Sequence, residues 1–159
     1  MVEEYPGYPD NPENLIKQAF QLVAQTEDMV NLPFFHKGIE ISAISFQLFE
    51  EQWLGMVLTP WMMSIFILPG PNQVWPKRKI GEKLGLQFPK GNALFFVGEL
   101  EGLGQYLSCS VMSPLDRHTG QLVYEKLAQD AIKELLGQKE PDLDEPENTK
   151  RRFFMMKSE

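Results

Sequence analysis

Residues that could carry chemistry are scarce in this chain. Its 159 residues include a single cysteine, Cys109, and two histidines, His36 and His118. One cysteine excludes an internal disulfide and any metal cage built from several thiolates. The three residues lie in separate segments without a nucleophile motif, and Cys109 shares a predicted strand face with Leu107 and Val111. We therefore expect Cys109 to be a buried, unreactive side chain, and the sequence predicts no catalytic residue.

Binding motifs for metals and nucleotides are also missing. The chain has no HExxH, EF-hand or CxxC pattern. Gly98, Gly102 and Gly104 match neither a dinucleotide fingerprint nor a phosphate loop, because they fall between predicted strands rather than before a helix. They are expected to form turns. The sequence thus predicts neither a metal site nor a cofactor.

Long apolar runs and excess positive charge are absent as well. The longest apolar run, around residues 61–68, is too short to span a bilayer, and residues 1–8 lack the regions of a secretory signal. Aspartate and glutamate total 22 against 15 lysines and arginines, for a net charge of -7. Such a chain repels phosphate backbones and anionic lipid. We expect a cytoplasmic protein that neither binds nucleic acid nor inserts into a membrane.

The hydrophobic pattern predicts one α+β domain over residues 11–137. Asn11 as a cap and Pro12 at the first helical position begin a helix that ends near Thr26, and a second helix runs from about Thr119 to Gly137. Between them, period-two alternation and short connections predict an antiparallel sheet of about five strands. Both helices are expected on one face of that sheet. The segments with strand character are 41–48, 53–59, 62–68, 84–88, 93–99 and 105–111.

The two ends of the chain differ from this domain in composition. Residues 1–10 are expected to form a flexible arm, and residues 138–159 a flexible tail that is acidic at first. The tail closes on Arg151 and Arg152 followed by Phe153 and Phe154. A plain solubilising tail would not need this basic-then-apolar patch.

Large apolar side chains beside predicted turns are the main functional signal. Tryptophan and methionine are over-used at protein-binding surfaces, although the same residues also fill cores. Trp61 and Trp75 each neighbour a proline in a predicted turn, and Met62 follows Trp61 directly. The residues expected to bind a partner are Trp61, Met62, Trp75, Arg151, Arg152, Phe153 and Phe154.

Several stretches together resemble the HybE/HupJ family of [NiFe]-hydrogenase assembly chaperones. These stretches are Phe49–Gly55, Thr59–Met62, Leu68–Pro71, Trp75–Pro76, Gly85–Pro89, Val97–Leu100 and Gln105–Pro114, with Arg151-Arg152 near the end. Each piece is short, but their joint order and spacing are specific. Some relatives carry a rubredoxin domain, which this chain lacks because it has no CxxC pairs.

The resemblance implies an assembly role without catalysis. It points to binding, before export, of the precursor of a hydrogenase large or small subunit, of a twin-arginine signal peptide, or of both. Two alternatives stay open. One is a small enzyme that uses Cys109 as nucleophile, and the other is a scaffolding module that acts through its C-terminal tail.

Overall fold

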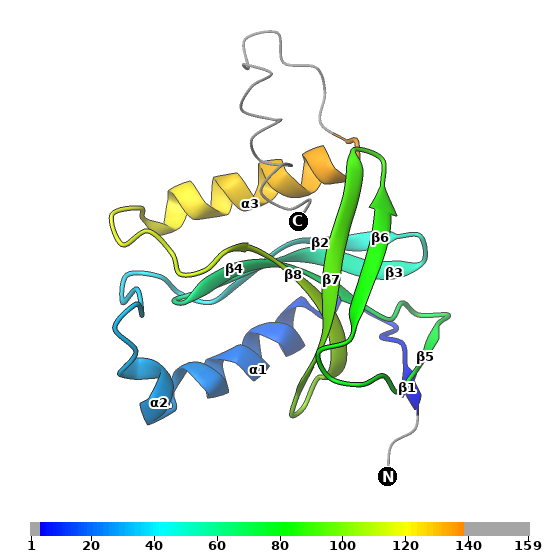
Figure 1. Cartoon of the computed structure of the whole chain (residues 1–159), viewed down its shortest axis with the longest axis horizontal. Helices are drawn as coiled ribbons and strands as arrows, with labels where there is room; N and C mark the ends of the chain where they lie inside the picture. The colour runs from blue at the N-terminus through cyan, green and yellow to red at the C-terminus, as the bar shows by residue number, and fades with distance from the viewer. Residues whose placement is uncertain (1–3, 139–159) are drawn as a thin grey trace, which may run out of the picture.

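The computed structural model describes residues 4–138, which form an antiparallel sheet with helices on both sides (Figure 1). The main sheet has six strands in the order β2-β3-β4-β8-β7-β6, and β1 and β5 form a separate two-stranded sheet. The elements are β1 (Glu4–Pro6), α1 (Glu13–Ala24), α2 (Glu27–Val30), β2 (Ser42–Phe49), β3 (Gln52–Thr59), β4 (Met62–Leu68), β5 (Val74–Pro76), β6 (Lys83–Phe88), β7 (Gly91–Leu100), β8 (Gly104–Met112) and α3 (Gln121–Leu135). The predicted α+β class is confirmed, with six strands in the main sheet where about five were expected.

Helix α1 begins one residue later than its sequence predicts, with Pro12 rather than Asn11 at the N-cap. The side-chain oxygen of Asn11 accepts a hydrogen bond from the backbone N–H of Glu13 (3.1 Å), while Pro12 occupies the entry to the first turn. Ile16, Ala19 and Phe20 face inward at helical spacing. The helix ends at Ala24, two residues before the predicted end, and the short α2 follows it.

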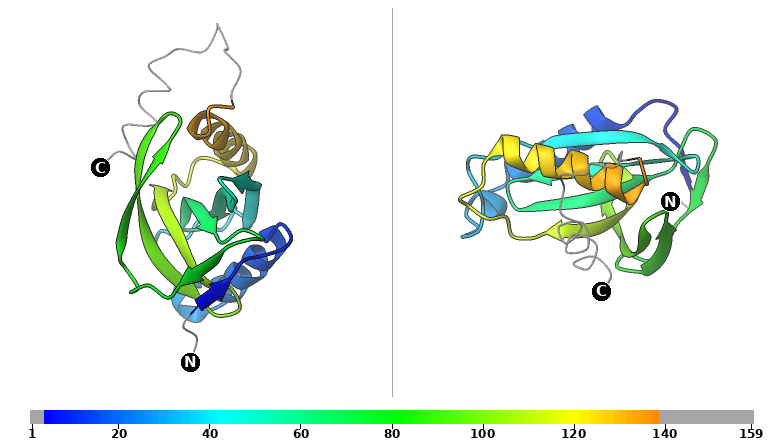
Figure 2. Two further views of the ribbon diagram at one scale, coloured as in Figure 1. Left: turned by 90° about the vertical axis from the view of Figure 1, so that its right-hand side faces the viewer. Right: turned by 90° about the horizontal axis from the view of Figure 1, so that it is seen from above.

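The two long helices cover opposite faces of the sheet, so the expectation that both lie on one face is wrong (Figure 2). Strands β3 and β4 are apolar on both sides, and alternate side chains of a strand point to opposite faces. Each face of the sheet must therefore be buried by a separate helix. The α3-side core joins Leu54, Met56, Leu58, Ile65 and Ile67 to Tyr124, Ala128 and Ile132. The α1-side core joins Trp53, Val57, Phe66 and Leu68 to Ile16 and Phe20.

Residues 4–8 are held against the segment around β5, although the sequence places them in a flexible arm. Tyr5 pairs with Trp75 in the two-stranded sheet, and the backbone N–H of Gly7 donates to Gln73 O (2.8 Å). A Cβ on Gly7 would overlap the carbonyl group of Gly70, so glycine is required for the chains to approach this closely. Strand β5 consequently forms over Val74–Pro76, outside the predicted strand segments.

Candidate partner-binding surface

The turn between β3 and β4 presents Trp61. Thr59 Oγ1 accepts hydrogen bonds from the backbone N–H groups of Trp61 (3.3 Å) and Met62 (3.1 Å), which closes the turn that Pro60 begins. Trp61 and Met62 are half-buried and pack against the α1-side core. Two predicted partner-binding residues therefore lie together, with part of each side chain open to solvent.

Two other aromatic residues surround Trp61. Its ring centroid lies 6.3 Å from that of Phe20 on α1 and 6.2 Å from that of Phe35 in the loop before β2. Aromatic pairs at this separation stabilise one another beyond the area they bury. Phe34, next in sequence to Phe35, is 43% exposed. We call Phe20, Phe34, Phe35, Trp61 and Met62 the Trp61 cluster.

Two loops contact the backbone of the Trp61 turn. The backbone N–H of His36 donates to Pro60 O (2.8 Å), and Ser113 Oγ lies 3.5 Å from Trp61 O. The His36 ring is held in turn, because its Nε2 lies 2.8 Å from Thr119 O. These contacts join the loops before β2 and before α3 to the turn, so they hold the backbone at Trp61 in place.

A shallow hollow of about 380 Å³ lies beside the Trp61 cluster. Its wall includes Phe35 of the cluster and Pro60 of the turn, and both polar and apolar side chains line it. The lining residues are Lys17, Gln21, Ala24, Phe35, Ile39, Glu40, Ile41 and Pro60. The sequence did not single out Phe20 and Phe35 as binding residues. Phe20 belongs to the apolar stripe of a helix, and Phe35 is the second residue of a Phe-Phe pair that follows Pro33.

Trp75 lies elsewhere and is buried. Only 8% of its surface is exposed, and it belongs to the α3-side core rather than to the Trp61 cluster. Its indole N–H donates to Gln73 Oε1 (3.2 Å), and the Arg78 guanidinium lies 5.6 Å from the ring centroid. The structure thus separates Trp75 from Trp61 and Met62. The other predicted binding residues, Arg151, Arg152, Phe153 and Phe154, lie outside the described residues.

The candidate groups for a cysteine enzyme lie in different settings, with Cys109 in the sheet core and both histidines in loops close to Asp116. Cys109 is 4% exposed within the α3-side core, opposite Ile65 of the neighbouring strand. The His36 ring contacts the backbone of Gly38 and Thr119, while His118 is exposed. A nucleophilic thiol needs access to substrate and a nearby base, and this position gives Cys109 an apolar, inaccessible setting. The structure therefore supports the structural interpretation of Cys109.

Asp116, in the loop before α3, has a lowered pKa. The pKa of Asp116 lies below its usual value because its carboxylate accepts a hydrogen bond from the backbone N–H of His118 (2.9 Å). The Thr119 hydroxyl (3.3 Å) and the charges of His118 and His36 lower that pKa further. Asp116 caps the loop that braces the Trp61 turn, which is a structural role.

Neither metal ligation nor membrane crossing is evident in the described chain. Within residues 4–138, no three or more His, Cys, Asp or Glu side chains gather closely enough to hold a metal ion. The helices of that same range are too short or too polar to cross a bilayer.

Comparison with known proteins identifies the family. The sequence profile described as "[NiFe]-hydrogenase assembly, chaperone, HybE" matches residues 11–157. The chain is 44% identical over 136 residues to the hydrogenase-2 operon protein HybE of Escherichia coli K12, covering 86% of this chain and 83% of that protein. It is 29% identical over 142 residues to the probable rubredoxin HupJ of Rhodobacter capsulatus, covering 85% of this chain and 51% of that one.

The fold agrees with that assignment. The solution structure of HybE from Escherichia coli superposes with a TM-score of 0.73 at 42% sequence identity, covering 92% of this chain and 90% of the other. The sequence profile and the 44% identity each extend over most of the chain. Sequence and structure therefore lead to the same conclusion: the chain belongs to the HybE family of [NiFe]-hydrogenase assembly chaperones.

Proposed function

We propose that this chaperone binds the precursor of a [NiFe]-hydrogenase large or small subunit in the cytoplasm, before twin-arginine export, and performs no catalysis itself. The observation that carries the proposal is the half-buried Trp61 cluster beside an open hollow, in a chain of an assembly-chaperone family. Immature subunits expose apolar segments, and such segments need a receptor with apolar area still available.

The chemistry of the cluster suits transient capture. Tryptophan contributes a large contact area with few rotatable bonds, and methionine adapts its shape to varied partners. Trp61 and Met62 provide both kinds of side chain in adjacent positions. The net charge of -7 adds long-range attraction for basic segments, such as the n-region of a twin-arginine signal peptide.

Trp61→Ala tests the proposal directly. The measurement is the affinity of the purified variant for a co-expressed hydrogenase subunit precursor, with thermal unfolding recorded to show that the fold is intact. We expect capture to weaken by at least about tenfold, since a central tryptophan typically contributes 2 kcal/mol or more to an interface.

The matched control is Leu122→Ala on α3, where an apolar side chain that is 80% exposed lies outside the Trp61 cluster. Its capture should stay within about twofold of the unaltered protein. A folded Trp61→Ala protein that retains full capture would refute the assignment of the binding surface. Failure of the unaltered chain to capture any precursor would refute the function.

The tail residues remain part of the proposal as a second contact. Arg151, Arg152, Phe153 and Phe154 combine cationic and apolar groups, which suits binding to another polypeptide. Removing residues 139–159 should weaken capture less than Trp61→Ala does. If the truncated protein captures the precursor with unchanged affinity, the tail takes no part.

A further inference from the structure

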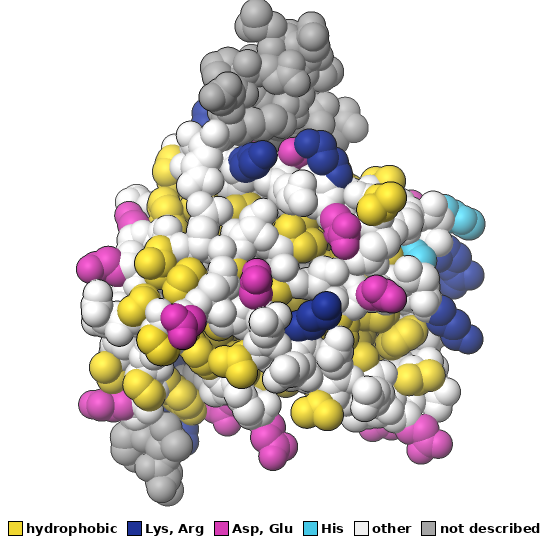
Figure 3. Space-filling view, turned by 180° about the vertical axis from the view of Figure 1, so that it is seen from behind, with side chains coloured by type: hydrophobic (Ala, Val, Ile, Leu, Met, Phe, Trp, Pro, Cys, Tyr) yellow, Lys and Arg dark blue, Asp and Glu magenta, His cyan; other side chains and the backbone are white. Residues whose placement is uncertain are grey.

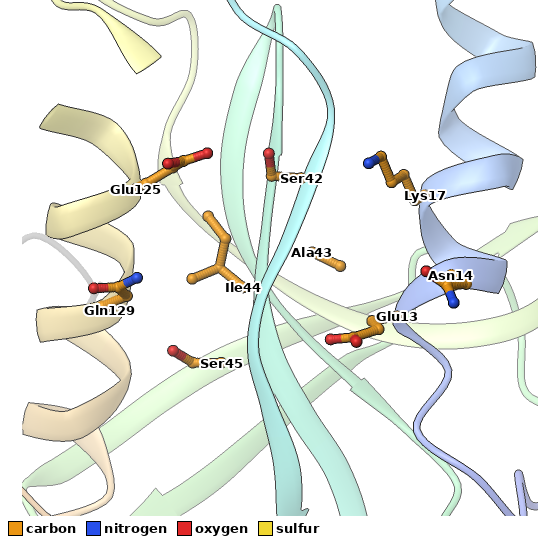
Figure 4. Close-up of a pocket in the computed structure, with 9 residues that line it drawn as sticks. All are labelled: Glu13, Asn14, Lys17, Ser42, Ala43, Ile44, Ser45, Glu125 and Gln129. Carbon is orange, nitrogen blue, oxygen red and sulfur yellow. The ribbon is translucent and has the colours of Figure 1, made fainter. Parts of the chain in front are cut away.

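The edge of the main sheet at β2 lies open between two helices. Strand β2 is the last strand on its side of the sheet, with α3 above one face and α1 below the other (Figure 2). A hollow of about 430 Å³ follows this edge. Its lining residues are Glu13, Asn14, Lys17, Ser42, Ala43, Ile44, Ser45, Glu125 and Gln129 (Figure 4). Figure 4 shows strand residues along the floor with a helix on each side.

Side chains already take the place of a neighbouring strand at both ends of this edge. The Gln121 side chain accepts from the backbone N–H of Glu40 (2.8 Å) and donates to the carbonyl of the same residue (3.3 Å). At the other end, Asn11 Nδ2 donates to Phe46 O (3.0 Å). An amide that both donates to and accepts from one residue mimics the pairing of an antiparallel strand.

Between these two ends the backbone faces the hollow. In an antiparallel pair, the N–H and C=O groups of successive residues alternate between the two neighbours. The registers from β7 through β8, β4 and β3 make Ser42–Leu58 and Ile44–Met56 hydrogen-bonded pairs with β3. The alternation therefore directs the N–H and C=O of Ala43, which lines the hollow between them, away from β3 and into the hollow. The register shift between Ile44 and Gln47, with φ of +58° at Ser45, then ends the regular edge. The open stretch suits a short extended segment.

The walls of the groove favour cationic side chains. Glu13 lines it from α1 and Glu125 from α3, while Lys17 is the single base among the lining residues. Within residues 4–138, the one ion pair is Lys126 with Asp130, so neither wall carboxylate has a cationic partner in this part of the chain. Figure 3 shows acidic side chains scattered among hydrophobic ones across this side of the molecule. A basic segment would supply the missing countercharge.

The groove is continuous with the proposed binding surface. Lys17 lines both this hollow and the one beside the Trp61 cluster, and Ser42 follows Ile41 of the second hollow directly. A chain laid along β2 therefore reaches Phe35 at the rim of the cluster. The polar, acidic groove along β2 is therefore followed directly by the aromatic Trp61 cluster.

We propose that this groove binds an extended, basic-then-apolar segment of the client polypeptide as an added strand on β2. Its cationic side chains lie between Glu13 and Glu125, its backbone pairs with Ala43, and its apolar residues reach the Trp61 cluster. The proposal rests on the proposed function, because it names the part of the client that is held and the way it is held. Main-chain pairing gives affinity across many sequences, and the two walls select charge.

A synthetic peptide tests this mode of binding. The probe is a fluorescent twelve-residue peptide with two adjacent arginines followed by phenylalanine and leucine residues, titrated into the full chain. We expect saturable binding together with slowed amide hydrogen exchange at Ala43. N-methylation of alternate backbone amides in the probe should abolish binding, because it removes the donors that a strand must supply. Unchanged affinity after N-methylation would overturn strand addition.

Charge reversal tests the walls. The double variant Glu13→Lys with Glu125→Lys should weaken probe binding by on the order of tenfold at low salt. The matched control is Glu82→Lys with Glu101→Lys, which changes the net charge equally at exposed positions outside the groove and should stay within about twofold. Equal loss in both double variants would overturn the groove and leave only a long-range charge effect.

The outcomes also separate this proposal from the proposed function. If the wall variant captures the subunit precursor fully while Trp61→Ala loses it, the groove assignment fails and the function stands. If the precursor is never captured but the probe still protects the Ala43 amide, the groove stands and the function fails. If the unaltered chain forms a dimer in sedimentation that the wall variant abolishes, a second copy occupies the groove and the proposal is overturned.

Discussion

Trp61 and Trp75 have the same local context in sequence and opposite surroundings in the structure. Each stands next to a proline at the end of a strand-forming segment. Trp61 is half-buried between Phe20 and Phe35 beside an open hollow, whereas Trp75 is buried under Tyr5 and the Arg78 guanidinium. The difference arises from what pairs with each segment. Strand β1 pairs with the Trp75 strand, while the Trp61 turn keeps one side open.

The contrast predicts that one tryptophan serves folding and the other binding. A buried indole that makes a hydrogen bond contributes to the stability of the domain. A half-buried indole contributes less to stability and keeps area for a partner. The following substitutions test this division, from the largest expected effect to the smallest.

Trp75→Ala should cause the largest loss of stability. The indole is 8% exposed, so its removal leaves a cavity and also removes one of the hydrogen bonds that Gln73 Oε1 accepts, while the bond from the Gly70 N–H remains. We expect the free energy of unfolding to fall by about 3–5 kcal/mol. Denaturant unfolding measures it, with Trp75→Phe as the milder control. A loss below about 1 kcal/mol would mean that the Trp75 region is not a folding element.

Gly98→Ala should come second, because it disturbs the aromatic layer on the α1 side of the sheet. A Cβ at this position would lie 2.6 Å from Cζ of Tyr106, whose ring stacks on Phe66 at 4.5 Å. We expect a loss of about 1–3 kcal/mol from the displaced ring. Gly85→Ala is the matched control, since its Cβ would meet nothing within 4 Å. Equal unfolding free energies for the two variants would contradict the close packing at Gly98.

Trp61→Ala should cost roughly 1–2 kcal/mol of unfolding free energy, because part of the indole already faces water. Its effect on precursor capture should be the larger of the two changes. Measured side by side, Trp75→Ala should harm stability and Trp61→Ala should harm capture. A Trp61→Ala protein as unstable as Trp75→Ala would remove the distinction between the two tryptophans.

Asp116→Asn should have the smallest effect, visible as a change in pH dependence. The pKa of Asp116 is lowered in the folded protein by the His118 N–H, and its usual value is 3.8. A lowered folded pKa stabilises the protein above the unfolded value and loses that stabilisation as pH falls through the folded value. The unaltered protein should therefore melt slightly higher than Asp116→Asn at about pH 6, and the difference should shrink as the pH falls below 3.8. A difference that grows as the pH falls would show the opposite linkage.

Most elements of the fold follow from local patterns. Helix α1 starts within one residue of its predicted start at Asn11-Pro12, and β2 lies within one residue of the predicted range 41–48, because each depends on neighbouring residues. The strand β1 was missed. Its pairing joins Tyr5 to Trp75, and no local pattern records a contact between segments so far apart. The same reason explains why the sequence treated Trp75 as a surface residue.

The sequence by itself determined the α+β class, the absence of a nucleophile motif at Cys109 and the family resemblance. These depend on residue types and on spacing along the chain. The tertiary structure alone decided that α1 and α3 lie on opposite faces, that β2 becomes an open edge between them, and which tryptophan stays exposed. A hydrophobic stripe in the sequence shows only that one face of a helix or strand is buried. Which segment covers it is set by long-range packing, where the apolar area on both sides of β3 and β4 requires one helix for each face.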